Sequence, residues 1–168
     1  MKKTYQKLII TCFLISSFVF FCGIDACVGL RFYDNGDGTI TDERTGLIWL
    51  QNAECYGLQN WDNTMSSIDE LNSGECGLSD GSVAGDWRLP TKDELQEIGT
   101  DPPSTWDSGY PVVTWTMPGA PFIGVQSVVY WSSTEYSTST VWVVYMGNGC
   151  ANTFGPFDAH VWPVRSAN

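Results

Sequence analysis

Apolar side chains recur at helical spacing along residues 61–71. Trp61, Met65, Ile68 and Leu71 are separated by four, three and three positions, which places them on one face of an α-helix. The residue before this run is an asparagine, a favoured N-cap because its side-chain oxygen accepts a free backbone N–H of the first turn. The pattern therefore predicts a helix whose apolar face packs against the core.

The sequence between Trp87 and Glu94 predicts an extended segment, a proline that ends it, and the first residues of a helix. Trp87 and Leu89 are apolar and separated by one polar residue, which is typical of a strand, and a proline follows them. Thr91 and Glu94 have the spacing of a capping box, in which each side chain accepts the backbone N–H of the other. The sequence therefore predicts a second short helix over residues 92–98.

Short apolar or alternating runs predict the strands. Turn residues separate them, above all the Asn-Gly and Asp-Gly steps at 35–38, which supply positive φ at little cost. The last run contains Pro163, which indicates an edge strand or a bulge. Because the helices are few, the strands short and no repeat is present, we expect one α+β domain. The expected strands span residues 31–34, 39–42, 47–50, 128–131, 140–145 and 160–165.

Residues 34–38 also carry enough oxygen atoms to raise the alternative of a calcium loop. Counted from Asp34, the third and fifth positions are Gly36 and Gly38, where an EF-hand requires side-chain oxygens. A hairpin turn is therefore the favoured interpretation. The sequence leaves open whether calcium binds elsewhere, and we expect no cofactor.

Residues 100–126 combine several prolines with many aromatic side chains. The prolines exclude a long regular element, and the aromatic content argues against disorder. We expect a long irregular loop region, and loops of this length are usually functional. Sugar rings stack on exposed aromatic rings while carboxylates accept their hydroxyl hydrogens. The alternative is that the rings only anchor the loop. The candidate ligand-binding residues are Trp106, Asp107, Tyr110, Trp115, Glu135, Tyr136 and Asp158.

The N-terminus has the order of a secretory signal peptide. Lysines precede an apolar run at 8–21, and small residues follow it up to Ala26. The run is shorter than the ~20 residues that a membrane span requires. We expect residues 1–26 to be removed and residues 27–168 to form the domain, secreted, periplasmic or at the cell surface. Lipidation of Cys27 is an open alternative, although the preceding residues match a lipoprotein cleavage box poorly.

Four cysteines remain after removal of the signal peptide. An even count in an oxidising compartment favours two disulfides, with three pairings available. We expect Cys55 to pair with Cys76, because this bond would bracket the first helix, and Cys27 to pair with Cys150 unless it carries lipid. Zinc is not expected, since no C-x-x-C spacing occurs and the chain has one histidine.

The charge of the chain restricts its partners. The formal net charge is −11. Removal of the signal peptide leaves five basic and 18 acidic side chains, a net charge of −13. Such a surface repels nucleic acid, anionic lipid and sulfated polysaccharide. The favoured interpretation is a soluble exported protein that its charge keeps apart from its neighbours, and the alternative is affinity for cations or neutral sugars.

Catalytic patterns are weak, and we expect a protein that is not an enzyme. His160 could act with Cys150 only if the two lay within hydrogen-bond reach, and a disulfide is the favoured state of that cysteine. The acidic residues show no spacing that selects a hydrolytic pair. Arg88 and Arg165 lie between apolar residues and are expected to pair with carboxylates. Core packing is expected for Trp49, Trp61, Trp87, Trp131 and Trp162.

Several ordered motifs resemble the Lcl C-terminal domain family over about residues 31–165. They are DGT at 37–39 with TD at 41–42, TGLIW at 45–49, GDWRLPT at 85–91 with EL at 94–95, YWSST at 130–134 and VWPVR at 161–165. The resemblance implies a C-type-lectin-like fold with two short helices, small and mostly antiparallel sheets, paired N- and C-terminal strands and a long irregular loop region. It also places Cys55 and Cys76 where many relatives carry a pair.

The family resemblance further implies a secreted or cell-surface protein, often an adhesin or a carbohydrate-binding module. Two departures qualify it: glycosaminoglycan binding in the family calls for a basic surface, and the motifs of calcium-dependent lectins are missing. We therefore expect an exported binding module for a neutral glycan or a protein, with no nucleic-acid partner and no membrane span after signal removal. The alternatives are a structural or homo-oligomer-forming domain, and an enzyme of the formylglycine-generating type with a reactive cysteine pair.

Overall fold

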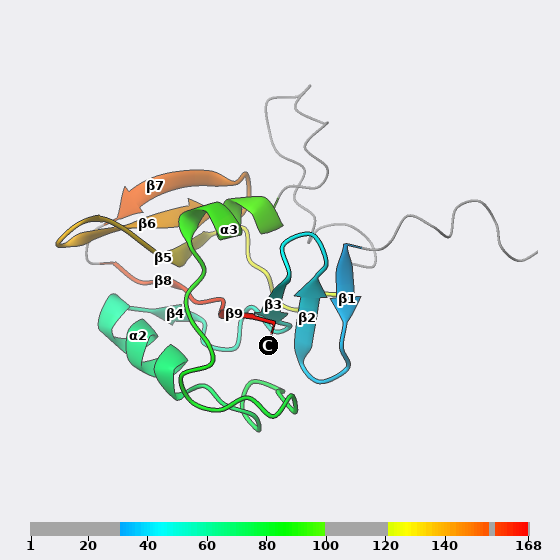
Figure 1. Cartoon of the computed structure of the whole chain (residues 1–168). Coiled ribbons are helices and arrows are strands. Elements are labelled where there is room, and N and C mark those ends of the chain that lie inside the picture. Colours follow the sequence, from blue (N-terminus) through cyan, green and yellow to red (C-terminus); the bar gives the residue numbers. More distant parts are fainter. Residues whose placement is uncertain (1–30, 100–120, 155–156, 168) are drawn as a thin grey trace, which may run out of the picture. The chain divides into compact units, whose positions relative to one another are not determined.

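The computed structural model describes residues 31–99, 121–154 and 157–167. The first of two small sheets contains both ends of this part of the chain (Figure 1). Its strands are antiparallel and have the order β1-β2-β3-β9. Their bounds are β1 (Phe32–Asp34), β2 (Thr39–Asp42), β3 (Leu47–Leu50) and β9 (Val164–Ser166). The C-terminal strand thus pairs with an early one, as the family resemblance implies.

The second sheet has the order β4-β8-β5-β6-β7. All its pairs are antiparallel except β5 with β8. Its strands are β4 (Leu58–Gln59), β5 (Val129–Ser137), β6 (Thr140–Tyr145), β7 (Cys150–Phe154) and β8 (Ala159–His160). With the two helices α2 (Trp61–Glu70) and α3 (Lys92–Ile98), this arrangement confirms the α+β class.

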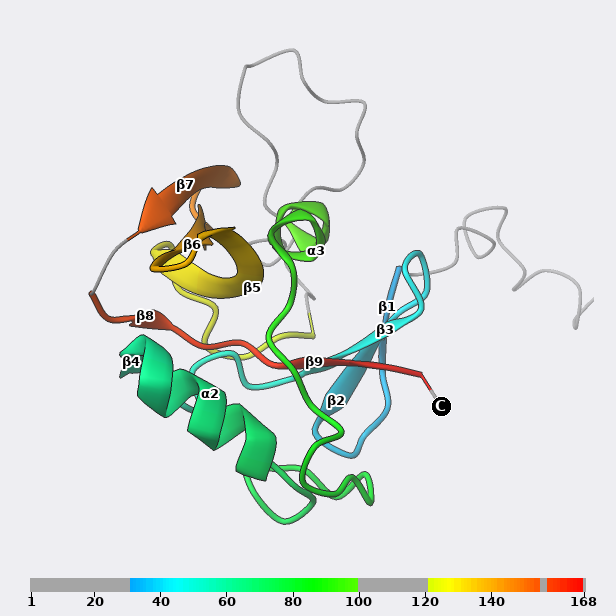
Figure 2. The ribbon, with the colours of Figure 1, turned by 60° about the vertical axis from the view of Figure 1, so that its left-hand side comes forward.

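The sequence predicts a single strand over residues 160–165, and this prediction is wrong. The chain pairs with β5 up to His160, leaves the second sheet, and joins the first sheet from Val164. Pro163 lies in the interval and has no N–H to donate to a ladder, while its carbonyl accepts the Leu50 N–H at 3.1 Å. The proline therefore marks a change of sheet. Figures 1 and 2 show α2 and α3 on opposite sides of this β8–β9 segment.

The first helix begins where the sequence predicts, with Asn60 accepting the backbone N–H of Asn63 at 2.9 Å. Its inward face differs from the prediction, because Met65 is 48% exposed. Thr64 is buried instead, and its hydroxyl donates to the Asn60 carbonyl at 2.8 Å. The capped first turn thereby directs Thr64 inward together with Ile68, one turn later.

The second helix is present over the predicted residues. Thr91 and Glu94 form the capping box, and Leu95 is buried. Glu94 also binds Arg88 through two hydrogen bonds of 2.8 Å each. Arg88 is not in a regular strand, but its backbone exchanges two hydrogen bonds with Val164 of β9. The cap, the ion pair and the bridge together connect the start of α3 to β9 of the first sheet, while the helix itself packs against β5, β6 and β7 of the second.

Four of the five tryptophans expected in the core are buried there: Trp49, Trp87, Trp131 and Trp162. Trp61 is the exception and is only partly buried. Arg165 pairs with Asp80 at 3.1 Å, so both arginines within apolar runs make the expected ion pairs.

The turn between β1 and β2 is a hairpin turn, as predicted. Asp34 accepts the Gly36 N–H at 2.8 Å, and Asp37 accepts the Thr39 N–H at 3.1 Å. Gly38 has φ +86°, and a Cβ there would lie 2.4 Å from the Gly77 carbonyl oxygen, so a side chain is excluded. Across the described residues, no group of three or more His, Cys, Asp or Glu side chains could hold a metal ion.

The predicted disulfide between Cys55 and Cys76 is present and brackets α2. Cys150 is exposed and forms no disulfide within the described residues. Cys27 lies outside those residues, so the Cys27–Cys150 pairing stays a prediction.

Acid should destabilise the domain partly through Glu94. Burial disfavours its charge, but the hydrogen bonds from Arg88 and Thr91 outweigh burial and hold the pKa of Glu94 below its ordinary value of 4.5. The stabilisation is complete above that value and is lost as the pH falls through the lower pKa of the folded state. We expect Glu94→Gln to lower the free energy of unfolding by about 1 kcal/mol at neutral pH and to reduce its loss in acid.

Urea unfolding of the parent protein and of the Glu94→Gln variant, at a series of pH values from neutral to acid, measures this change in the free energy of unfolding. Asp93→Asn, which removes an exposed carboxylate from the same helix, is the matched control and should keep the acid sensitivity of the parent. Parallel pH profiles for Glu94→Gln and the parent would contradict the prediction.

Removal of the disulfide should lower stability substantially. Cys55 and Cys76 are 21 residues apart, and opening a loop of this size costs about 3 kcal/mol. We expect the double variant Cys55→Ala/Cys76→Ala to unfold at correspondingly lower urea concentration. Ser79→Ala, an exposed change just beyond the same loop, should leave the midpoint unchanged. A loss below about 1 kcal/mol in the double variant would argue against this role.

Candidate functional site

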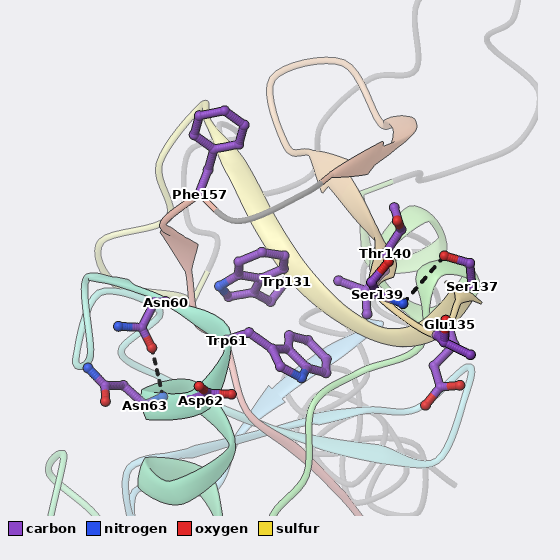
Figure 3. Close-up of a pocket in the computed structure, with 12 residues that line it drawn as sticks. Asn60, Trp61, Asp62, Asn63, Trp131, Glu135, Ser137, Ser139, Thr140 and Phe157 are labelled. Carbon is purple, nitrogen blue, oxygen red and sulfur yellow. Dashed lines mark hydrogen bonds between the residues drawn. The ribbon is translucent and has the colours of Figure 1, made fainter.

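A groove of about 770 Å³ lies between the N-terminal end of α2 and the β5–β6 hairpin (Figure 3). The helix contributes its N-cap and first turn, residues 60–63. The hairpin contributes Trp131, Glu135 and residues 137–141, and Phe157 lies in the segment before β8. The groove thus combines segments from three parts of the sequence.

Trp61 is held in place on one side of the groove. It is the first residue of α2, directly after the Asn60 cap. Its ring meets the Trp131 ring edge-on, with centroids 5.4 Å apart. Trp131 is itself fixed, because its indole N–H donates to the Gln59 carbonyl at 2.8 Å. The helix cap and the buried ring together determine where the partly exposed Trp61 ring lies.

An irregular register shapes the opposite side. The β5–β6 pairing shifts between Trp131 and Glu135 and again between Glu135 and Ser137. Glu135 is opposite Val141, and Ser137 is opposite Thr140. These shifts bring hydroxyl side chains of the hairpin end to the groove, next to an exposed carboxylate.

The groove is acidic and contains no cation. Asp62 and Glu135 are its charged residues, and no Lys, Arg or His is among the described lining residues. Asp62 lies in the first turn of α2, where a carboxylate offsets the positive end of the helix dipole. Glu135 has no such complement, so the larger share of the uncompensated negative charge lies at the hairpin side.

The structure separates two predicted ligand-binding residues that are adjacent in sequence. Glu135 lines the groove. Tyr136 is 64% exposed and meets the Trp142 ring edge-on at 5.7 Å. The Lys92 ammonium group lies 5.9 Å from the centre of the Trp142 ring. Tyr136 therefore belongs to the face of the sheet that carries α3, away from the groove.

Of the remaining predicted ligand-binding residues, Asp158 lies within the described part of the chain. Asp158 is exposed and follows Phe157, but it does not line the groove. Trp106, Asp107, Tyr110 and Trp115 lie outside the described residues, so their role in binding stays a prediction.

Sequence reasoning missed Trp61 and Phe157 as site residues. Because Trp61 falls on the apolar period of α2, the sequence predicts core packing for it. A signal was nevertheless present, because Asn60, Asp62 and Asn63 surround it with polar residues at the start of the helix. Phe157, which is 63% exposed, had no comparable signal.

His160 lies outside the groove, in a buried cluster. Its Nδ1 atom is 3.1 Å from a carboxylate oxygen of Glu54, and its ring is 5.2 Å from that of Tyr130. Burial, with a smaller contribution from the charge of Glu54, raises the pKa of Tyr130 to about 12. Two strands separate β8 from β7, so His160 and Cys150 lie about 14 Å apart across the sheet. The geometry does not bring these two residues together as a catalytic pair.

Fold and groove define a small α+β domain with a preformed, ligand-sized groove that is aromatic, hydroxyl-rich and acidic. The chain belongs to the Lcl C-terminal domain family, whose model matches residues 38–165. A comparison with curated proteins gives no match. No helix in the described part of the chain is long and apolar enough to cross a membrane.

Proposed function

We propose that this protein is an exported binding module whose groove between α2 and the β5–β6 hairpin holds a carbohydrate. The observation that carries the proposal is the groove itself, in which a positioned tryptophan faces hydroxyl and carboxylate side chains. Its volume of about 770 Å³ falls within the roughly 300–1,000 Å³ typical of small-molecule sites. The protein would act by binding, without catalysis.

The lining suits a pyranose better than a purely apolar ligand. The Trp61 and Phe157 rings offer faces for the C–H groups of a sugar, as Figure 3 illustrates. Asn60, Asn63 and the hairpin hydroxyls can donate to and accept from sugar hydroxyl groups. Because carboxylates only accept, Glu135 would take a hydroxyl hydrogen.

Export is supported by two independent features. The N-terminus has the pattern of a signal peptide. The Cys55–Cys76 disulfide is typical of proteins that fold in an oxidising compartment. A surface location fits the family and remains part of the proposal.

Truncation of the aromatic rings should remove glycan binding. On a glycan array, we expect the exported protein to retain neutral oligosaccharides. Trp61→Ala or Phe157→Ala should lower that binding about fivefold, because a stacking contact of an aromatic ring is worth about 1 kcal/mol. Phe157 is the more exposed residue, so its variant should fold normally; thermal unfolding checks both.

Tyr136→Ala is the matched control, because it truncates an equally exposed ring on the other face of the sheet. It should bind as the parent does. Equal retention by the Phe157 and Tyr136 variants would remove the groove as the site, and a parent protein that binds no glycan would refute the function.

A further inference from the structure

Glu135 gives the groove a preference within the class of carbohydrates. We infer that the groove selects a glycan with free amino groups, a hexosamine oligomer, whose ammonium group pairs with Glu135. This inference rests on the proposed carbohydrate function. It concerns the chemistry of the ligand, which the fold and the family do not specify.

The first step is the charge that remains after internal compensation. Asp62 offsets the helix dipole of α2, whereas Glu135 is exposed on β5 with the apolar Val141 as its cross-strand partner. No ion pair to Glu135 occurs among the described residues. A carboxylate beside a groove without cations attracts a positive group and repels sulfate or uronate.

The second step is the surroundings of that carboxylate. Figure 3 shows the Trp61 ring between the first turn of α2 and Glu135, with Phe157 toward the opposite end of the groove. A sugar that stacks on Trp61 would thus place a ring substituent near Glu135. The ring face of Trp61 adds attraction for an ammonium group, since aromatic faces carry negative charge density.

The third step distinguishes a sugar amine from a lysine-rich peptide. The hairpin presents Ser137, Thr138, Ser139 and Thr140 to the groove, all neutral donors and acceptors. A pyranose offers several hydroxyl groups at fixed positions for such partners, whereas a lysine side chain offers one charged end on an apolar stem. The observations therefore favour the amino sugar.

Calorimetry on the purified exported protein tests the inference with two probes of equal length. These are a tetramer of β-1,4-linked glucosamine and the same tetramer with every amine acetylated, both measured at mildly acidic pH. We expect the free-amine tetramer to bind about two- to fivefold more tightly at low salt, as one exposed charge pair allows. The advantage should shrink as salt is added.

The variant Glu135→Gln should lose the preference and bind the two tetramers with equal affinity, because its amide carries no charge. Glu43→Gln is the matched control, because it removes the same charge from an exposed turn between β2 and β3 of the other sheet. It should keep the preference of the parent.

Equal affinity of the parent for the two tetramers would overturn the inference and leave the carbohydrate function standing. A preference that survives Glu135→Gln would also overturn it, since another group would then be responsible. Displacement of the tetramer by tetralysine at equal concentration would assign the groove to basic peptides. Binding of neither tetramer, with or without amines, counts against the carbohydrate function itself.

Discussion

The structure depends on one buried hydrogen bond and the ring that makes it. The indole N–H of Trp162 donates to the carbonyl of Leu50 at 2.7 Å, across 112 positions of sequence. The ring has no exposed surface and contacts Trp49 at 5.1 Å and Phe122 at 5.0 Å between centroids. Because Trp162 lies where the chain passes from β8 to β9, this contact joins the two sheets. A buried N–H without a partner would cost about 1–3 kcal/mol, so few other positions are open to this ring.

The groove follows from this junction. β8 lies between β4 and β5, so a fixed β8 sets the distance from the segment that leads into α2 to the β5–β6 hairpin. Trp131 adds a direct link, because it belongs to β5 and donates to Gln59 of β4. The disulfide holds the two flanks of α2 together. A groove built on such supports loses little conformational freedom when a ligand enters, which favours affinity at a given contact area.

Local rules of the sequence were sufficient for the helices and most strands. Asn60, Thr91 and Glu94 cap their helices because each cap needs only neighbours within one turn. Features that depend on contacts between residues far apart in the sequence could not be predicted from these local rules. The sheet change at Pro163 depends on Leu50, whose backbone N–H donates to the Pro163 carbonyl. The inward turn of Thr64 depends on the packing of the whole helix. Among the described residues, the predicted ligand-binding set and the groove share Glu135, since a groove between distant segments leaves no pattern in any one of them.

Long-range and short-range electrostatics act on a ligand at different stages. The net charge of the whole chain, −11, repels polyanions before contact but is screened beyond about 8–10 Å at physiological salt. Within the groove, the dipole of α2 offsets part of the charge of Asp62, and Glu135 remains next to neutral hydroxyl groups and aromatic rings. Under the proposed function, the overall charge would exclude polyanionic ligands, and Glu135 would select among the others. The net charge of the surface therefore gives little information about the ligand. The position of Glu135 on the irregular β5–β6 hairpin gives more.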